Sequence, residues 1–188
     1  MTTLIYRDGV LSGDRRYGMP LAGDQIVYVD RPKVHLHPSG KIAYGICGSV
    51  KGKDAITDIG DYLLSVAVLI EQGTVPDMKP VLMEYMVNSI NLILLTRKNA
   101  WLFVLDEGDD STVKVTNLDD LPYYAVGSGQ WAAVALLGEG TELKRIYEIV
   151  PLIDGMTGPK FDVYKKTKLK SLGVKHARSN KRKGNILP

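Results

Sequence analysis

The chain opens with Thr2-Thr3-Leu4-Ile5-Tyr6-Arg7-Asp8-Gly9-Val10-Leu11-Ser12-Gly13-Asp14, directly after Met1. In this stretch two short apolar segments flank an Asp-Gly pair. An Asp-Gly pair between β-prone segments is a strong short-range signal for a β-hairpin. The stretch therefore predicts that the chain is built into a sheet from its first residues.

The segments that follow carry blocks of strand and helix signals. Strands are indicated where apolar residues recur at alternate positions, over residues 25–30, 33–37 and 41–47. Helices are indicated where apolar residues recur at spacings of three and four, over residues 54–72 and 80–88. The first of these is the best amphipathic helix in the chain.

The second half repeats this order. Strands are predicted over residues 91–96, 100–105, 112–116 and 123–126, with the acidic residues 106–110 in a loop. Helices follow over 131–137 and 142–150, the second of them ended by Pro151, and a last strand covers 160–164. Strands and helices in separate blocks predict an α+β domain with two antiparallel sheets between helix layers, rather than a parallel sheet built from alternating βαβ units.

Length and charge divide the chain into two parts. Its 188 residues fit one domain at roughly 150 residues per domain, and 45% hydrophobic with 24% charged residues excludes a disordered, collagen-like or disulfide-framework protein. No Asp or Glu follows Asp162, whereas nine Lys or Arg lie between Lys165 and Lys183. Without those nine, 15 basic and 21 acidic residues remain, a net charge of −6. We expect a domain over residues 1–164 and a flexible basic tail over 165–188, which can bind nucleic acid or an acidic partner.

Other features favour a cytoplasmic protein without a membrane span. Cys47 is the single cysteine, which excludes an intramolecular disulfide and fits a reducing compartment. The start does not resemble a secretory signal, and the longest apolar runs fall short of the roughly 20 residues that cross a bilayer. His35, His37 and His176 lack carboxylates at ligand spacing, and no phosphate-binding or dinucleotide-binding loop occurs. We expect neither a metal nor another cofactor.

Thr2 is a candidate nucleophile. A small second residue normally allows removal of the initiator methionine, which exposes the α-amine and the hydroxyl of Thr2 on one residue. A free α-amine has a pKa of about 7.7 to 8.0, so it is partly neutral near pH 7 and can serve as the base for its own hydroxyl. Met-Thr-Thr is also a common protein start without catalytic meaning, so other motifs must decide.

Four further motifs follow the opening hairpin in order: Lys33-Val34, Gly45-Ile46-Cys47-Gly48-Ser49, Ala125-Val126-Gly127-Ser128-Gly129 and Asp154-Gly155-Met156-Thr157-Gly158. With the hairpin they resemble the motifs of proteasome β-subunits and of HslV, the bacterial proteasome-like peptidase. The resemblance covers about residues 2–164. It implies a four-layer αββα sandwich of the N-terminal nucleophile (Ntn) hydrolase type, with two antiparallel sheets between helix layers.

The resemblance also implies a catalytic set. Thr2 is expected to attack the peptide carbonyl, with the Lys33 ammonium beside it to favour an alkoxide and Asp14 to hold Lys33 in place. Gly48 is expected to offer its backbone N–H to the oxyanion. Taken without the resemblance, these residues are a solvated strand lysine, a turn aspartate and a turn glycine.

A second implied group supports the amine of Thr2. Ser128 is expected to orient that amine and relay its proton, with Asp154 and Thr157 completing the network; the simpler alternatives are a helix cap for Ser128 and an ordinary turn residue for Asp154. The sequence departs from the family at Ser49, where glycine is usual, at Thr157, where serine is usual, and at Arg15-Arg16, where small residues are usual. The extra positive charge either shapes substrate preference or marks an altered pocket.

The implied function is a threonine-type endopeptidase that cleaves unfolded proteins through an acyl-enzyme on Thr2 after Met1 removal. The resemblance further implies a homo-oligomeric ring served by a separate ATP-dependent unfoldase. One alternative is a catalytically inactive proteasome-like assembly or binding module whose basic tail engages nucleic acid or an acidic partner. Another keeps the nucleophile but cleaves a small amide.

Overall fold

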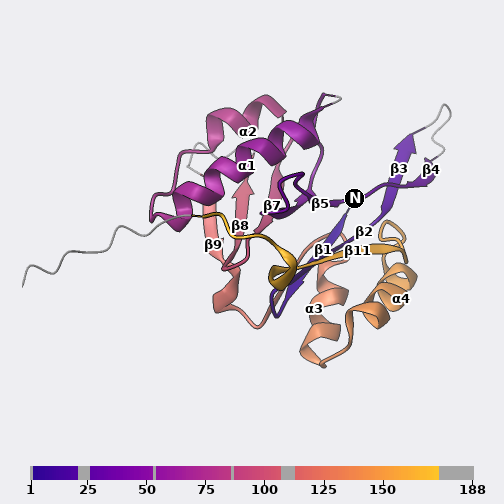
Figure 1. Cartoon of the computed structure of the whole chain (residues 1–188). Helices are drawn as coiled ribbons and strands as arrows, with labels where there is room; N and C mark the ends of the chain where they lie inside the picture. The colour runs from indigo at the N-terminus through magenta and orange to yellow at the C-terminus, as the bar shows by residue number, and fades with distance from the viewer. Residues whose placement is uncertain (1, 21–25, 53, 86, 107–112, 174–188) are drawn as a thin grey trace, which may run out of the picture.

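The computed structural model describes residues 2–20, 26–52, 54–85, 87–106 and 113–173 (Figure 1). The strands there are β1 (Thr3–Arg7), β2 (Val10–Asp14), β3 (Arg16–Pro20), β4 (Ile26–Asp30), β5 (Val34–Leu36), β6 (Ala43–Cys47), β7 (Ile90–Leu95), β8 (Ala100–Leu105), β9 (Lys114–Asn117), β10 (Tyr123–Gly127) and β11 (Phe161–Lys165). The α-helices are α1 (Ala55–Glu71), α2 (Lys79–Tyr85), α3 (Gln130–Gly138) and α4 (Leu143–Ile153), and the short 3-10 helices are η1 (Leu118–Asp120) and η2 (Lys166–Lys168).

The predicted N-terminal hairpin is confirmed. β1 and β2 pair antiparallel, with Tyr6 opposite Leu11. Asp8 and Gly9 form the tip at φ values of 50° and 74°. Positive φ at both central residues is typical of a type I′ turn, whose twist matches that of the flanking strands.

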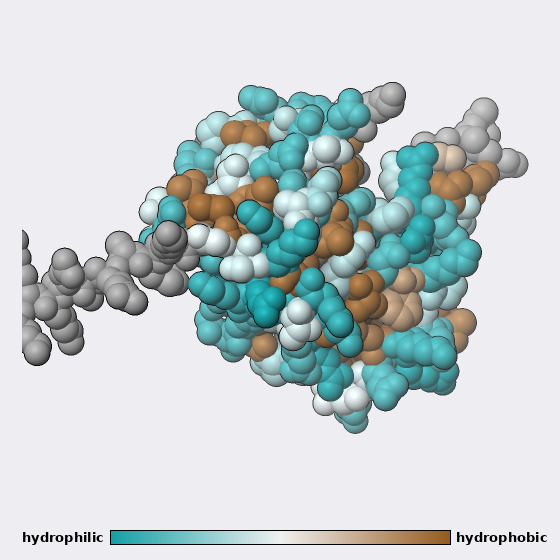
Figure 2. Space-filling model, viewed as in Figure 1, coloured by the Kyte–Doolittle hydropathy of each residue, from teal (hydrophilic) through white to brown (hydrophobic). Residues whose placement is uncertain are grey.

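Two antiparallel sheets form the centre of the molecule. One has the strand order β10-β1-β2-β11, so the N-terminal hairpin lies between two strands from the C-terminal half (Figure 1). The other has the order β5-β6-β7-β8-β9. β3 and β4 form a separate ribbon that projects from the body, and Figure 2 shows a notch between this ribbon and the side that carries α1 and α2.

Three apolar clusters hold these elements together. α1 and α2 pack on the five-stranded sheet through a cluster that includes Leu63 and Phe103. A second cluster, with Leu4 of β1 and Ile93 of β7, lies where the two large sheets face each other. Neighbouring residues of a strand point to opposite faces, and Ile5 accordingly packs with α3 and α4 in a third cluster. The N-terminal strand is therefore buried on both faces.

α4 differs from its prediction at its end. Pro151 was expected to end this helix, but the helix continues to Ile153. Proline removes one N–H from the i→i−4 ladder, in this case the bond to the carbonyl of Tyr147. The ladder resumes afterwards, since the N–H of Asp154 donates to the carbonyl of Val150 at 2.8 Å. A proline in the last turn is thus accommodated, and its position fixes where Asp154 emerges.

Other predictions need adjustment. β3 was not predicted, because its five residues Arg16–Pro20 include a glycine and a proline, which are unfavourable in strands, and only Tyr17 and Met19 alternate. α2 ends at Tyr85, earlier than the predicted residue 88. β9 begins at Lys114 rather than at residue 112, and most of the acidic 106–110 loop lies outside the described residues.

The first part of the expected basic tail belongs to the packed structure. Lys165 ends β11, and Lys166 begins η2. Leu169 is 2% exposed and joins the cluster between the sheets, and the Nζ of Lys166 donates to the carbonyl of Lys98 at 3.0 Å. Residues 174–188 lie outside the described residues. Within the described part of the chain, no helix has the length and apolar character needed to cross a membrane.

Candidate functional site

Thr2 lies directly before β1, next to the last residues of β10. Its side chain is mostly buried, since the residue is 7% exposed, and its carbonyl oxygen accepts a hydrogen bond from the N–H of Ser128 at 3.0 Å. Gly127 adopts φ 109°, and a Cβ atom there would lie 1.6 Å from the carbonyl oxygen of Thr2. Only glycine permits this approach, so the Gly127-Ser128 pair fixes the position of Thr2.

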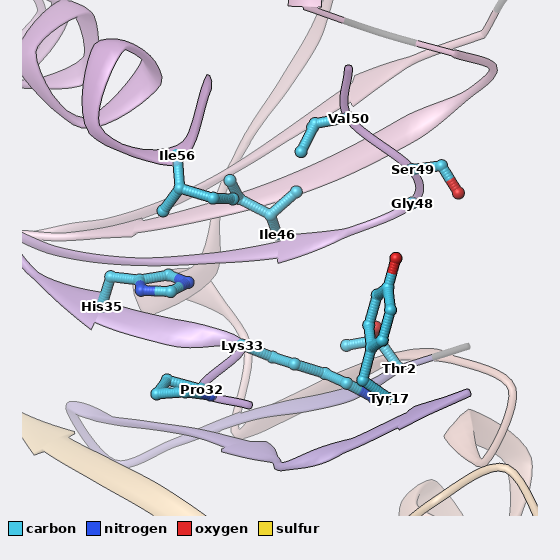
Figure 3. Close-up of a pocket in the computed structure, with 10 residues that line it drawn as sticks. All are labelled: Thr2, Tyr17, Pro32, Lys33, His35, Ile46, Gly48, Ser49, Val50 and Ile56. Atoms are coloured by element: carbon cyan, nitrogen blue, oxygen red, sulfur yellow. The ribbon is translucent and has the colours of Figure 1, made fainter. Parts of the chain in front are cut away.

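Two cavities meet at Thr2. The smaller has a volume of about 130 Å³ and is lined by Thr2, Tyr17, Pro32, Lys33, His35, Ile46, Gly48, Ser49, Val50 and Ile56. The larger, of about 570 Å³, is lined by Thr2, Tyr17, Gly18, Cys47, Gly48, Ser49, Asn88, Ser89 and Ser128. Figure 3 shows Lys33 extending toward Thr2 in the smaller cavity. Thr2, Lys33 and Gly48, which are far apart in the sequence, are thus neighbours around one space.

Lys33 forms a buried ion pair with Asp14. Its Nζ lies 3.0 and 3.1 Å from the two carboxylate oxygens, and the side chains are 6% and 0% exposed. Burial lowers the pKa of Lys33 from its ordinary value, while the charge and the hydrogen bonds of Asp14 oppose that effect. The ammonium is therefore held in a fixed position next to Thr2.

Asp14 is itself held by backbone groups from three parts of the chain. Its carboxylate accepts hydrogen bonds from the N–H groups of Thr3 at 2.8 Å, Arg16 at 2.9 Å and Gly158 at 3.1 Å. A buried carboxylate needs such partners, because an unpaired charge in the interior is costly. Asp14 consequently ties the start of β1 and the loop after α4 to the same carboxylate that orients Lys33.

Ser128, which lines the larger cavity, belongs to a chain of hydroxyl groups that extends to Thr3. Ser128 Oγ donates to Asp154 Oδ2 at 2.6 Å, and Thr157 Oγ1 donates to the same oxygen at 2.5 Å. Since Thr157 uses its proton for the carboxylate, Thr3 Oγ1, 2.6 Å away, donates to Thr157, and it accepts the N–H of Gly129 at 3.1 Å. Each hydroxyl therefore has a defined direction of donation, which ends at Asp154.

Asp154 is kept ionised by these contacts. Burial alone raises its pKa, but the hydrogen bonds from Ser128, Thr157 and the N–H of Met156 outweigh burial and hold the pKa of Asp154 below its ordinary value. Hydrogen bonds to the charged form of a carboxyl group favour that form. The group that Ser128 contacts is thus a carboxylate at neutral pH.

Gly48 borders both cavities. It has φ 138°, and a Cβ atom there would lie 2.6 Å from Ile90 and 2.8 Å from the carbonyl oxygen of Ser89. Glycine is therefore required at this position for two reasons, conformation and space. Asp8 is the only non-glycine residue with positive φ among those described, so Ser49, where the family has glycine, needs no left-handed backbone.

The two arginines that follow Asp14 are occupied outside these cavities. Arg15 pairs with Asp162 at 2.9 Å, and Arg16 donates to the carbonyl of Gly155 at 2.7 Å. Neither lines the cavities at Thr2. Arg15 and Arg16 therefore make these contacts with β11 and with the loop after α4, outside the walls of both cavities.

Several neighbours of Thr2 were not predicted from the sequence. Tyr17 lines both cavities, but it lies on the unpredicted strand β3. Cys47 Sγ lies 4.0 Å from the carbonyl oxygen of Thr2, and burial raises the pKa of this thiol. Thr3 was noted only as part of the Thr-Thr motif. Its alternation with Thr2 along a strand was the available signal that its side chain faces the opposite side.

His35 and His37 have ordinary surroundings, and His176 lies outside the described residues. His35 packs on the ring of Tyr44, with centroids 5.4 Å apart, and burial lowers the pKa of His35. His37 contacts Ser39 and Asp61, both at 2.8 Å. Among the residues that the structure describes, no group of three or more His, Cys, Asp or Glu side chains is placed to hold a metal ion.

Solved structures share this architecture. Eukaryotic HslV from Trypanosoma brucei superposes with a TM-score of 0.54 at 17% identity, over 87% of this chain and 98% of that chain. The Gly-1 mutant of Anbu from Hyphomicrobium sp. strain MC1 has a TM-score of 0.51 at 16% identity, over 90% of this chain and 84% of that chain. No protein-family model matches the sequence, and no curated protein matches it significantly. At these identities the likeness establishes an HslV-like fold.

Proposed function

We propose that this protein is an N-terminal-threonine peptidase of the proteasome and HslV type, which hydrolyses peptide bonds in unfolded proteins after removal of Met1. The observation that carries the proposal is the arrangement around one cavity, where Thr2 and Gly48 face Lys33 and Lys33 is paired with the buried Asp14. The HslV-like fold supports it. So does the packing of helices, sheet, sheet and helices, which agrees with a four-layer αββα sandwich.

In the first step the hydroxyl of Thr2 attacks the substrate carbonyl carbon, and its proton passes to the free α-amine of the same residue. The Lys33 ammonium stabilises the forming alkoxide. The N–H of Gly48 donates to the oxyanion, and one preorganised donor of this kind contributes roughly 3 kcal/mol. Collapse of the tetrahedral intermediate breaks the C–N bond, and the leaving amine takes the proton from the α-ammonium.

In the second step water attacks the resulting ester. The α-amine accepts a proton from that water, and the breakdown of the second intermediate returns the proton to Oγ of Thr2 and releases the acid. Ser128 orients the amine, and Asp154 with Thr157 keeps Ser128 in place through the contacts at 2.6 and 2.5 Å. No redox, metal or group-carrier chemistry enters these steps, so the reaction requires no cofactor.

The wider setting follows the same proposal. Copies of the chain assemble into a ring with the Thr2 sites inside, and a separate ATP-dependent unfoldase feeds it. The basic residues of the C-terminal segment, including those beyond residue 173, form a contact region for an acidic partner outside the catalytic pattern. Native mass spectrometry measures the subunit number directly.

The test compares three proteins on unstructured fluorogenic peptides: wild type, Thr2→Ala and Thr2→Ser. Intact mass must first show loss of one methionine from the wild type. Thr2→Ala is expected to reduce kcat by at least about a thousandfold, because the variant can still bind the peptide but has no hydroxyl with which to form the acyl-enzyme. Thr2→Ser keeps both the amine and a hydroxyl, so it retains measurable activity. Wild-type rates in Thr2→Ala, or a retained Met1 in an active protein, would refute the mechanism.

A further inference from the structure

Tyr17 is a lining residue that the two cavities at Thr2 share. It lies on β3 and lines both the 130 Å³ and the 570 Å³ space. Figure 3 shows its ring beside Thr2, with the hydroxyl directed toward the Gly48-Ser49 segment. The guanidinium of Arg31 lies over the ring, 5.3 Å from its centroid, a distance at which a cation attracts an aromatic face. Together with Thr2, Gly48 and Ser49, which also line both cavities, the ring borders the place where the two cavities meet.

The two cavities differ in chemistry. Ile46, Val50 and Ile56 form the apolar side of the smaller cavity, opposite Lys33 (Figure 3). The lining of the larger cavity includes Asn88, Ser89 and Ser128, which suit peptide backbone and polar groups. An attacked carbonyl carbon lies about 3 to 3.5 Å from the nucleophile. A carbonyl carbon at Thr2 thus places the side chain on the acyl side of the cleaved bond within reach of the apolar cavity, next to Lys33 and Gly48.

The size of that cavity sets a limit. Its 130 Å³ is slightly less than the engineered cavity of about 150 Å³ that holds one benzene molecule. A branched aliphatic side chain is smaller than benzene and fits such a space, whereas an indole is larger than benzene and would have to extend beyond it. Tyr17 borders both this cavity and the neighbouring one of 570 Å³, so its ring is placed to keep the two spaces apart.

We propose that Tyr17 is a specificity-determining residue, which restricts the acyl-side residue of the substrate to aliphatic side chains such as Leu or Val. This inference rests on the proposed peptidase function. Removing the ring joins the two cavities and admits large aromatic side chains. The wall is the ring itself and not its hydroxyl, so Phe replaces Tyr without loss of selectivity.

The β3–β4 ribbon offers a matched control. Tyr28 on β4 is 46% exposed, the same fraction as Tyr17, and Arg16 lies over its ring at 5.1 Å. Tyr28 lines neither cavity at Thr2. Tyr28→Ala therefore removes an equivalent ring and an equivalent cation contact from the same ribbon without opening the wall.

The experiment measures kcat/KM for two peptides that differ only in Leu or Trp at the acyl-side position. We expect wild type, Tyr17→Phe and Tyr28→Ala to prefer Leu by at least about 10-fold, as expected for steric discrimination in an apolar pocket. Tyr17→Ala is expected to lower that preference to about threefold or less, mainly by lowering KM for the Trp peptide. A ratio in Tyr17→Ala within twofold of wild type overturns the inference, and so does an equal fall in Tyr28→Ala.

A binding measurement separates this inference from the proposed function. Calorimetry with the same peptides on Thr2→Ala protein, with and without Tyr17→Ala, reports the preference without any hydrolysis. A Leu preference that disappears with the ring supports the role of Tyr17 even if no peptide is cleaved. Equal binding of both peptides to Thr2→Ala protein overturns that role, while hydrolysis that depends on Thr2 leaves the proposed function intact.

Discussion

Asp14→Asn tests the buried ion pair on which the site is built. The substitution keeps the size of the side chain and removes its charge. Asparagine has one acceptor oxygen where the carboxylate has two. In the wild type the N–H of Thr3 donates to Oδ1, and the N–H groups of Arg16 and Gly158 donate to Oδ2. If the amide oxygen takes the place of Oδ1, it still accepts from Thr3, but the amide NH₂ then faces the two N–H groups that have lost their acceptor. Lys33 is left as a buried cation without its counter-charge.

The size of the effect follows from these contacts. Removing one partner of a buried pair costs about 3 to 5 kcal/mol, because the remaining charge is uncompensated. Each buried polar group left unpaired costs about 1 to 3 kcal/mol, and these two costs overlap at Asp14. We therefore expect Asp14→Asn to lower the free energy of unfolding by about 3 to 5 kcal/mol. The exposed pair Arg145–Glu148 at 2.9 Å provides the control, and Glu148→Gln should cost about 0.5 kcal/mol or less.

The assay is urea unfolding at pH 7, followed by tryptophan fluorescence. Trp101 is 7% exposed in the cluster beneath α1 and α2, so its emission reports loss of the core. An unchanged m-value shows that the transition still measures the same folded and unfolded states. If Asp14→Asn unfolds within 1 kcal/mol of wild type, the Lys33–Asp14 pair does not organise this site and the reasoning is refuted.

Three further changes test other parts of the structure. Gly127→Ala places a Cβ 1.6 Å from the carbonyl oxygen of Thr2, so it should displace Thr2 and abolish its labelling by electrophiles; retained labelling contradicts the close approach. Leu169→Ala removes a side chain that is 2% exposed between the sheets and should cost about 2 to 5 kcal/mol in urea unfolding, whereas no loss would show that the segment is not packed. The pKa of Asp154 is lowered in the folded state, so its contribution to stability is present above about pH 4 and is lost as the pH falls through the folded pKa. Asp154→Asn should therefore flatten the acid dependence of the unfolding free energy below about pH 4, and an unaltered dependence argues against this shift.

Local signals in the sequence predicted most of the secondary structure. The Asp8-Gly9 turn between two apolar segments specified the N-terminal hairpin, and the apolar spacing of α1 specified that helix. β3 had only a weak signal, the alternation of Tyr17 and Met19 beside a glycine and a proline, and its pairing with β4 makes it a strand. The continuation of α4 past Pro151 was missed because proline was treated as a helix stop, whereas a single missing N–H near the end of a helix costs less than one in its interior.

The site could be anticipated only in part. The resemblance of short motifs pointed to Thr2, Lys33 and Gly48, and the structure places these three around one cavity. The roles of Tyr17 and Thr3 depend on which surfaces meet across the fold, and a single sequence does not carry that information. The packed segment up to Leu169 was hidden by the run of lysines around it, because one buried leucine among exposed charges leaves no periodic pattern.

Labelling with an electrophile that bridges an N-terminal threonine amine and hydroxyl tests the central claim most directly. The protein is treated, its intact mass is measured, and the adduct is mapped by peptide sequencing, with Thr2→Ala protein as the control. We predict a single adduct on Thr2 of the chain that has lost Met1, and none on the control. Labelling at any other residue, or equal labelling of Thr2→Ala, would contradict the assignment of Thr2 as the nucleophile.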